Sequence, residues 1–385
     1  MRKIIVALVL PLLAVNISAQ AETDFDGVVD RVMESLTNVL TVNNGLDARI
    51  MGLAAENTLP GPEVGFEYKF PQQRGVGNRW GLEVSQGFDW PGIYRARRDA
   101  AEGLRDLRGR VSASAYRRLR CEVEDRVMQV IEARKRVAIL EVVERNLAEV
   151  SEKSEHMLNL GQITVLDRRK AEFELLAIKE KLTDARAELD RLTTTVGFGQ
   201  VIPDGLDRLT DFPARLTAAP ISTAEEIELE TEIVGEMSNA RVENLKKLPS
   251  FSLGYVHDFE EGIHFNGFSV GVNLPSYGAG KSATAARLEA ETAMMKLNEA
   301  RAERQAELKN NAAELVRLES LLADYDRAIG GDDYLRLLKK SFDARQITLT
   351  QYILDQNWYL NARLDHLALQ LRYHRLLPLA NPVSE

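Results

Sequence analysis

The sequence has few residues that interrupt regular structure and few that stack on nucleic-acid bases. Its 385 residues include 12 Pro and 25 Gly, a low share of turn formers that predicts long uninterrupted elements. Aromatic residues make up 6% and the formal net charge is −9, whereas a surface that neutralises phosphates needs a surplus of Lys and Arg. We therefore expect no nucleic acid among its partners.

Cysteine and long apolar runs are also scarce. The single Cys121 excludes an intrachain disulfide, and a lone thiol on a helix is most often a small core residue. After residue 21 no stretch reaches 18 consecutive apolar residues, which argues against a second membrane helix. An exported chain of this kind is either soluble or forms a β-barrel.

The first 21 residues have the pattern of a secretory signal peptide. A basic pair precedes an apolar run over residues 4–15, and the small residues Ala19 and Ala21 suit signal peptidase. The alternative is a membrane anchor, but Pro11 breaks the run, which is shorter than the ~20 residues that a span needs. We expect residues 1–21 to be removed by cleavage near Ala21.

An internal repeat organises the mature chain. Residues 161–164 (Gly-Gln-Ile-Thr) recur as residues 345–348 (Arg-Gln-Ile-Thr). Each half is predicted to contain a helix, two strands, one very long helix, a tight break and a second helix. The first repeat covers residues 22–192, a linker rich in Gly and Pro covers 193–220, the second repeat covers 221–377, and a tail covers 378–385. The expected strands are about 62–70, 79–90, 249–258 and 264–275, and the expected helices after them are 92–160, 162–192, 279–343 and 348–377.

The strand segments alternate apolar and polar side chains. In the first pair Glu63, Glu67, Glu83 and Asp89 share the polar face, with Lys69 as the one basic exception. About nine to eleven residues per strand, with aromatics at the ends, match a tilted strand crossing an outer membrane. A half-buried strand of a soluble sheet has the same period.

The helical segments carry coiled-coil seams with apolar residues spaced by three and four. One seam comprises Leu140, Val143, Leu147, Val150, Ser154 and Met157.

Four strands in lipid leave unpaired edges, each unsatisfied group costing several kcal/mol, so a barrel must be shared. Two chains give eight strands and a filled interior, whereas three give twelve and a lumen. We expect a cyclic homotrimer.

The chain resembles the TolC-like outer-membrane efflux factors, and the resemblance covers essentially the whole mature chain. Three segments carry it. They are residues 59–68, 85–92 (Ser-Gln-Gly-Phe-Asp-Trp-Pro-Gly) and 161–167 (Gly-Gln-Ile-Thr-Val-Leu-Asp). The Phe-Asp-Trp-Pro-Gly stretch is similar to the branch that serves heavy-metal cation efflux of the cobalt-zinc-cadmium resistance type.

The resemblance implies a mainly α fold with a small β part. Long antiparallel coiled-coil helices would form a periplasmic tunnel, and four strands per chain would contribute to a shared trimeric 12-stranded outer-membrane β-barrel, with residues 193–220 as an equatorial segment. It implies the exit duct of a tripartite efflux pump in a Gram-negative cell, exporting heavy-metal cations or other small toxic solutes. Its partners would be outer-membrane lipid, a periplasmic adaptor (membrane fusion) protein and an inner-membrane efflux transporter.

The two helix breaks are then the periplasmic tips, where the family docks its adaptor and closes its pore. By motif, Leu158, Gly161 and Asp167 fall on the first tip, whereas Arg345 stands at the second tip where Gly is usual. The candidate gate or docking residues are Leu158, Gly161, Asp167, Arg168, Arg169, Tyr352 and Asp355. Ordinary solvated turn residues are the alternative.

The residues that could bind a soft cation have no metal-motif spacing. His257 and His264 flank a turn and can lie close together, but such pairs are more often solvated surface than a metal site. His374 falls on a seam, and His156 and His366 are expected on helix surfaces. Basic runs, including residues 134–136, are expected to be solvated faces.

The sequence shows no catalytic constellation. No Ser-His-Asp order, phosphate loop or nucleophile with a matched base stands out, so no enzyme, metal or cofactor is predicted. The rival function is an exported periplasmic coiled-coil adaptor or scaffold without a pore. It shares the heptads and the signal peptide, but it does not explain four aromatic-edged strands.

Overall fold

The computed structural model describes residues 25–36, 38–70, 77–199, 202–330 and 333–382. The expected signal peptide, residues 1–21, lies outside these ranges. The chain divides into two compact units, which we call unit 1 (residues up to 38, 116–221 and 305–385) and unit 2 (39–115 and 222–304). None of the helices in the described ranges has a stretch long and apolar enough to cross a membrane.

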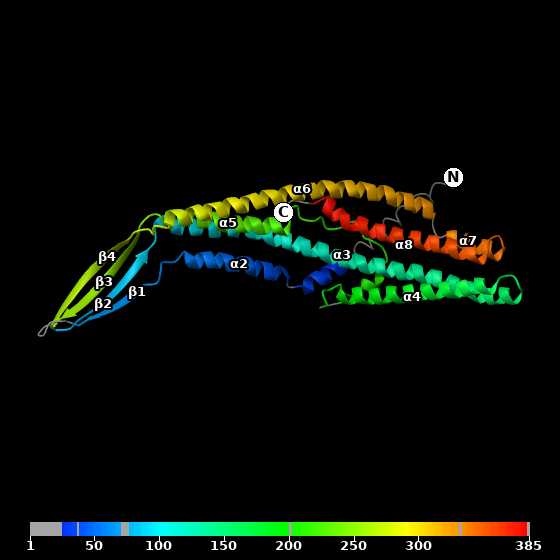
Figure 1. Cartoon of the computed structure of the whole chain (residues 1–385), viewed down its shortest axis with the longest axis horizontal. Coiled ribbons are helices and arrows are strands. Elements are labelled where there is room, and N and C mark those ends of the chain that lie inside the picture. The colour runs from blue at the N-terminus through cyan, green and yellow to red at the C-terminus, as the bar shows by residue number, and fades with distance from the viewer. Residues whose placement is uncertain (1–24, 37, 71–76, 200–201, 331–332, 383–385) are drawn as a thin grey trace, which may run out of the picture. The chain divides into compact units, whose positions relative to one another are not determined.

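Long helices and one four-stranded sheet make up the chain (Figure 1). The described helices include residues 25–35, α2 (Asn38–Glu56), α3 (Pro91–Asn159), α4 (Val165–Thr195), α5 (Ala224–Leu245), α6 (Ala279–Ile329), α7 (Asp333–Asp343) and α8 (Leu349–Ala380), with a short 3₁₀ helix at Leu206–Arg208. The strands are β1 (Glu63–Lys69), β2 (Arg79–Phe88), β3 (Ser250–Glu260) and β4 (Ile263–Asn273). The fold class expected from the sequence, mainly α with four strands, is confirmed.

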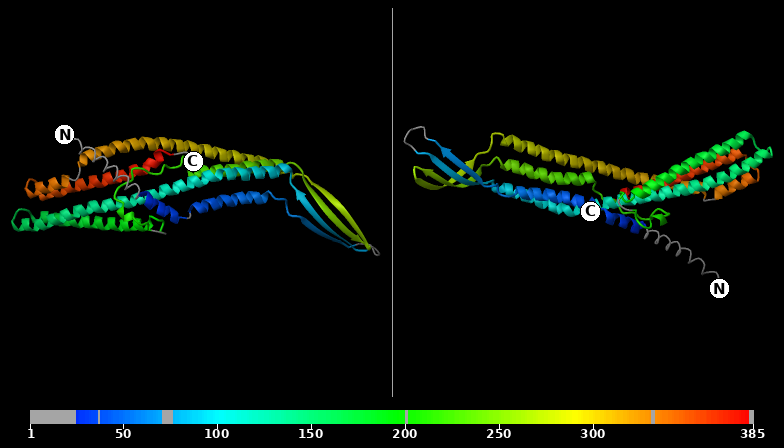
Figure 2. Two further views of the ribbon diagram at one scale, coloured as in Figure 1. Left: turned by 180° about the vertical axis from the view of Figure 1, so that it is seen from behind. Right: turned by 90° about the horizontal axis from the view of Figure 1, so that it is seen from below.

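The sheet of unit 2 is antiparallel with the order β1-β2-β3-β4. Figure 2 shows the four strands side by side from two further directions. The β3–β4 turn places Glu261 and Gly262 at φ 49° and 88°, as a two-residue hairpin turn that matches strand twist requires. Strands β2 and β3 come from different repeats, and their pairing runs from Arg79↔Glu260 to Phe88↔Phe251. This pairing joins the two hairpins into one sheet.

The helices of unit 2 pack through a small apolar core. It consists of Leu46, Ile50, Leu104, Val111 and Ile227, from α2, α3 and α5. Arg49 Nη1 donates to Thr231 Oγ1 at 3.1 Å, which ties α2 to α5 beside this core.

Unit 1 contains two helical hairpins, α3–α4 and α7–α8. Their shared core includes the predicted seam residues Leu140, Val143, Leu147 and Val150 of α3, with Ile178 of α4 and Leu360 of α8. The segment 279–343, expected to form one helix, is divided into α6 and α7. Gly330 follows α6 with φ 60°, a conformation that Gly adopts readily and that ends a helix.

Candidate functional site

The connection between α3 and α4, which we call the Gly161 turn, is closed by backbone hydrogen bonds. Gly161 N–H donates to Leu158 O and Gln162 N–H donates to Met157 O, both at 2.9 Å. This pair of hydrogen bonds requires the left-handed conformation at the first donor residue, Gly161, and Gly161 has φ 67°. Leu158, a candidate from the sequence, is half-buried here.

Helix α4 then begins with a capping box. Asp167 N–H donates to Thr164 Oγ1 at 3.1 Å, and Thr164 N–H donates to Asp167 Oδ2 at 3.2 Å. The Thr164 hydroxyl and backbone hydrogen bonds lower the pKa of Asp167. A carboxylate at this position also suits the positive end of the helix dipole.

The second turn, which we call the Arg345 turn, joins α7 to α8 with the same backbone pattern. Arg345 N–H donates to Phe342 O and Gln346 N–H donates to Ser341 O, both at 2.9 Å. Arg345 has φ 58°, so an Arg occupies the left-handed position that Gly161 occupies in the first turn. Thr348 Oγ1 accepts from Gln351 N–H at 3.2 Å, and α8 therefore has the Thr cap.

The two turns meet around a groove of about 510 Å³. It is lined by Met157, Gln162, Ile163, Asp167, Phe342, Arg345, Ile347, Thr348, Leu349 and Thr350. Lys170 Nζ donates to Thr350 Oγ1 at 3.3 Å and lies 3.6 Å from Asp167 Oδ1. Both turns lie at the same end of unit 1 (Figure 1).

Two ion pairs join α3 to α7 just behind the turns, and the sequence analysis missed them. Lys153 Nζ lies 2.7 Å from Asp343 Oδ1, and Lys339 Nζ binds Glu149 Oε2. The hydrogen bond from Lys339 lowers the pKa of Glu149. Their partners lie 190 positions apart, so no local spacing reveals them.

The remaining candidate tip residues have different surroundings. Arg168 and Arg169 both reach Glu172, at 2.8 and 3.0 Å. Asp355 Oδ1 accepts from Gln351 Nε2 at 2.6 Å. Tyr352 is only 1% exposed and packs against Phe342 at 5.1 Å between ring centroids. Burial raises the pKa of Tyr352 to about 12.

The two turns differ most in exposed apolar surface. Leu160, Val165 and Leu166 of the Gly161 turn are 57%, 60% and 73% exposed. At the Arg345 turn, Leu349 takes the place of Val165 in the repeat and is 4% exposed. The Gly161 turn therefore presents an aliphatic surface that the other turn lacks.

The sheet has one charged face. The register places Glu63, Glu67 and Glu83 on it, as predicted from their alternation, together with Lys69. Asp89 lies beyond the end of β2, with Oδ2 3.7 Å from Arg97 Nη1.

The register adds three charged residues that the sequence analysis missed. Arg79, Asp258 and Glu260 lie on the same face, and Arg79 Nη2 donates to Asp258 Oδ2 at 2.8 Å. Their signal was the same period of two, but Val256 interrupts the polar series in β3. Five carboxylates and two basic groups give this face a charge of 2 − 5 = −3 per chain.

The opposite face of the sheet is apolar and exposed. Its members include Val64, Phe66, Tyr68, Leu82, Val84, Leu253, Tyr255, Phe268, Val270 and Val272. Phe66 is 67% exposed and Phe268 is 85% exposed. An apolar patch of this extent marks a surface that another molecule or a membrane covers.

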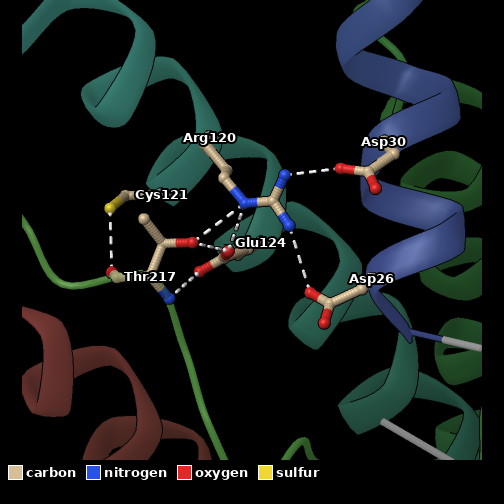
Figure 3. Close-up of polar contacts among 6 residues, drawn as sticks. All are labelled: Asp26, Asp30, Arg120, Cys121, Glu124 and Thr217. Carbon is tan, nitrogen blue, oxygen red and sulfur yellow. Dashed lines mark hydrogen bonds and ion pairs between the residues drawn. The ribbon is translucent and has the colours of Figure 1, made fainter. Parts of the chain in front are cut away.

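A polar cluster around the buried Glu124 anchors the linker in unit 1 (Figure 3). Arg120 lies 2.5 Å from Asp30, 3.1 Å from Asp26 and 3.2 Å from Glu124. Both oxygens of Glu124 accept from Thr217, one from its hydroxyl at 2.5 Å and one from its N–H at 3.0 Å. Burial raises the pKa of Glu124. The cluster thus ties the linker and the helical residues 25–35 to α3.

The one thiol belongs to the same region. Cys121 Sγ lies 3.3 Å from Thr217 O, and burial raises its pKa to about 12. A thiol in that state is protonated and inert at neutral pH.

Two expectations about solvated residues were wrong. His366, placed on a helix surface by the sequence analysis, is 8% exposed and lies 3.2 Å from Asp326. Arg134, placed on a solvated face, donates to the carbonyls of Leu206 and Leu209 at 2.9 and 2.6 Å. Burial lowers the pKa of both His366 and Arg134. In each case the partner comes from another segment of the chain.

Of the other His residues, His156 is exposed on α3, as expected, and the remaining three lie against aromatic rings. His374 stacks on Phe212 at 4.9 Å, and burial lowers its pKa to about 4, so it is neutral at physiological pH. His257 and His264 do meet, with Nε2 and Nδ1 3.2 Å apart. Across the described ranges, no three or more His, Cys, Asp or Glu side chains are grouped to hold a metal ion.

Comparison with known proteins gives structural likeness without sequence similarity. No protein-family description matches the sequence, and no curated protein matches it. The outer membrane protein VceC of Vibrio cholerae superimposes with a TM-score of 0.74 at 12% identity, covering 93% of this chain and 95% of its own. The outer-membrane channel OprN gives 0.72 at 16% identity, covering 93% and 90%.

A third structure agrees with these two. The CmeC outer membrane channel of Campylobacter jejuni gives a TM-score of 0.68 at 13% identity, covering 93% of this chain and 84% of its own. In each case nearly the whole of both chains is matched, so the likeness extends over helices and strands alike. This chain has the fold of these outer-membrane proteins.

Proposed function

We propose that the protein is an outer-membrane channel that serves as the exit duct of a tripartite efflux pump. The two faces of the sheet carry this proposal. One face exposes aromatic and aliphatic side chains, and the other carries net negative charge. A strand that separates lipid from a water-filled lumen has this division. The fold shared with outer-membrane channels supports the same function.

The edges of the sheet support a homotrimer. Among the described strands, β1 and β4 each have a single neighbour, and unpaired strand edges in lipid cost several kcal/mol per group. Three chains supply twelve strands, which close the edges and leave a lumen.

The turns support adaptor docking and gating. Leu160, Val165 and Leu166 form an exposed aliphatic surface at the Gly161 turn, which suits the apolar face of an adaptor helix. Polar contacts that Asp167 and Asp355 would make with neighbouring helices around the threefold axis are proposed to bias the pore toward a closed state. Each exposed contact contributes about 0.2 to 1 kcal/mol, and a trimer makes each of them three times.

The cargo and location complete the proposal. The negative face of the sheet favours cations, and the resemblance of the Phe-Asp-Trp-Pro-Gly stretch suggests heavy-metal cations or other small toxic solutes. The mature chain would lie in the outer membrane of a Gram-negative cell and extend into the periplasm. An inner-membrane transporter would supply the energy.

Disulfide crosslinking tests the shared barrel. In a Cys121→Ser background, Glu67→Cys in β1 is combined in turn with Phe265→Cys, Gly267→Cys or Ser269→Cys, which all lie on the polar face of β4. We expect one register to give a covalent trimer in the outer-membrane fraction. Each single-Cys variant is the matched control. A monomer that leaves the envelope without detergent would favour the periplasmic adaptor or scaffold instead.

Planar-bilayer recording tests conduction and gating. In 0.1 M salt we expect cation selectivity that falls as ionic strength rises. Asp167→Ala combined with Asp355→Ala should raise conductance, with Glu188→Ala, on an exposed part of α4, as the control. Anion selectivity would contradict the assignment of the charged face to the lumen, and unchanged conductance in intact trimers would mean that other residues close the pore.

A further inference from the structure

The β3–β4 hairpin brings two imidazole groups together near its turn. His257 Nε2 and His264 Nδ1 lie 3.2 Å apart, although the two residues are not directly opposed in the strand register. His257 pairs with Asn266, and Phe259 pairs with His264. Both His side chains extend from the mostly apolar face of the sheet, on which Asn266 also lies; His257 is half-buried and His264 is exposed.

The separation of the two nitrogens suits a metal ion between them. First-row metals bind imidazole nitrogen at about 2.0–2.1 Å. Two nitrogens 3.2 Å apart then subtend an angle of about 100° at the ion, between the cis angle of square or octahedral sites and the tetrahedral angle.

A supporting residue already orients the first ligand. His257 Nδ1 lies 2.8 Å from Asn266 Oδ1, which also accepts from Tyr255 Oη at 2.7 Å. Since an amide oxygen only accepts, His257 donates its Nδ1–H there, and the neutral form of the ring then has its lone pair on Nε2. This arrangement of a ligating His backed by a hydrogen-bond acceptor is usual at metal sites.

Aromatic rings hold the pair on both sides. The Trp80 ring centroid lies 5.6 Å from His257, and that of Phe259 lies 4.9 Å from His264. The charged residues of the neighbouring register positions, Asp258 and Glu260, lie on the other face of the sheet. The site therefore offers two imidazole nitrogens, without a carboxylate, on strands that meet at the β3–β4 turn.

We propose that His257 and His264 bind a divalent transition-metal ion, of the Cu²⁺, Ni²⁺ or Zn²⁺ class that imidazole prefers, through Nε2 and Nδ1. Before binding, His264 donates a hydrogen bond from its Nδ1–H to His257 Nε2. On binding, His264 loses the proton on Nδ1 and gains one on Nε2 by exchange with solvent. The charge of both rings is then unchanged, and each ring gives one lone pair to the ion. The ion replaces a hydrogen bond, and no redox step is involved.

Copper titration of the full-length protein, purified in detergent without a His tag, tests the site. We expect one Cu²⁺ per chain, with nitrogen hyperfine structure from two imidazoles in the electron paramagnetic resonance spectrum and competition by Zn²⁺. His257→Gln with His264→Gln should abolish this signal. Asn266→Ala should weaken binding about tenfold or more, as loss of such a supporting bond does at other sites.

His156→Gln is the matched control, because His156 is an exposed His on α3, and it should leave binding unchanged. The single variant His264→Gln, at an exposed position, serves if the double variant fails to assemble. Equal affinity in the His264→Gln variant, or a spectrum without two-nitrogen coupling in the wild type, would overturn the proposal. The measurement needs neither a conducting pore nor a pump, so its outcome is independent of the proposed function.

Discussion

The Gly161 turn and the Arg345 turn have the same backbone and different side chains. Both close with paired hydrogen bonds to the last turn of the preceding helix, both have a left-handed residue, and both start the next helix with Thr. The Gly161 turn exposes aliphatic side chains, whereas the Arg345 turn buries Leu349 and Tyr352. The two repeats therefore share the backbone conformation of the turn, whereas the side chains are exposed in one turn and buried in the other.

The largest expected difference concerns equivalent positions after each turn, Tyr352 and Arg168, which are 184 residues apart in the repeat. Tyr352→Ala removes a ring that is 1% exposed, and we expect a loss of about 3 kcal/mol or more in the free energy of unfolding. Arg168→Ala removes a partly exposed ion pair within α4, with Glu172, and should cost under about 0.5 kcal/mol. Denaturant titration of the purified protein compares them, and equal effects would contradict the distinction between core and surface.

The left-handed residues should respond with opposite signs. Gly161→Ala meets no neighbouring atom within 4 Å, so its cost is the backbone conformation alone, about 1 to 2 kcal/mol. Arg345→Gly relieves that cost but adds freedom to the unfolded chain, and we expect a net gain of under about 1 kcal/mol. Hydrogen exchange of the turn peptides measures both. Destabilisation by Arg345→Gly would show that the Arg side chain contributes contacts beyond its backbone.

The caps should differ in strength. Thr164 forms a capping box with Asp167, in which each residue accepts a hydrogen bond from the backbone of the other. Thr348 only accepts a hydrogen bond from the backbone N–H of Gln351. We expect Thr164→Ala to lower the free energy of unfolding by about 1 kcal/mol, and Thr348→Ala to lower it by less. Exchange rates of the first turn of α4 and of α8 provide the test, with Thr→Ser at each position as the conservative control. A larger loss at Thr348 would contradict it.

The smallest effect is a pH dependence confined to the Gly161 turn. The hydrogen bonds of Thr164 lower the folded-state pKa of Asp167 from its usual 3.8. The stabilisation is therefore complete above that usual value and is lost as the pH falls through the lowered one. The difference in thermal midpoint between wild type and Asp167→Asn should shrink between pH 6 and pH 3. Gln351→Ala, at the equivalent position, should show no such change.

The sequence predicted the features that depend on local periodicity. Alternation in β1 and β2 identified the face shared by Glu63, Glu67 and Glu83, and three-four spacing identified the seam around Leu147. The motif at residues 161–164 identified the first turn. These succeed because one neighbouring element decides each pattern.

What the sequence did not predict depends on partners far along the chain. Arg134 bonds to carbonyls more than 70 positions away, and Lys339 pairs with Glu149 across 190 positions. His366 is covered by residues of α6, including Tyr325 at 5.8 Å between rings. The break after Gly330 carried a local signal, a pair of glycines, that the helical spacing on either side masked.

The pairing of β2 with β3 joins segments that lie far apart in the sequence. The β1–β2 and β3–β4 hairpins close over short loops, which takes microseconds. Arg79 and Glu260, however, are paired partners 181 positions apart, so the ladder that contains them cannot form until β3 has been synthesised. Loop closure over such a separation is slow, and strand edges stay open to other chains meanwhile. We therefore expect the central ladder of the sheet to form after the two hairpins.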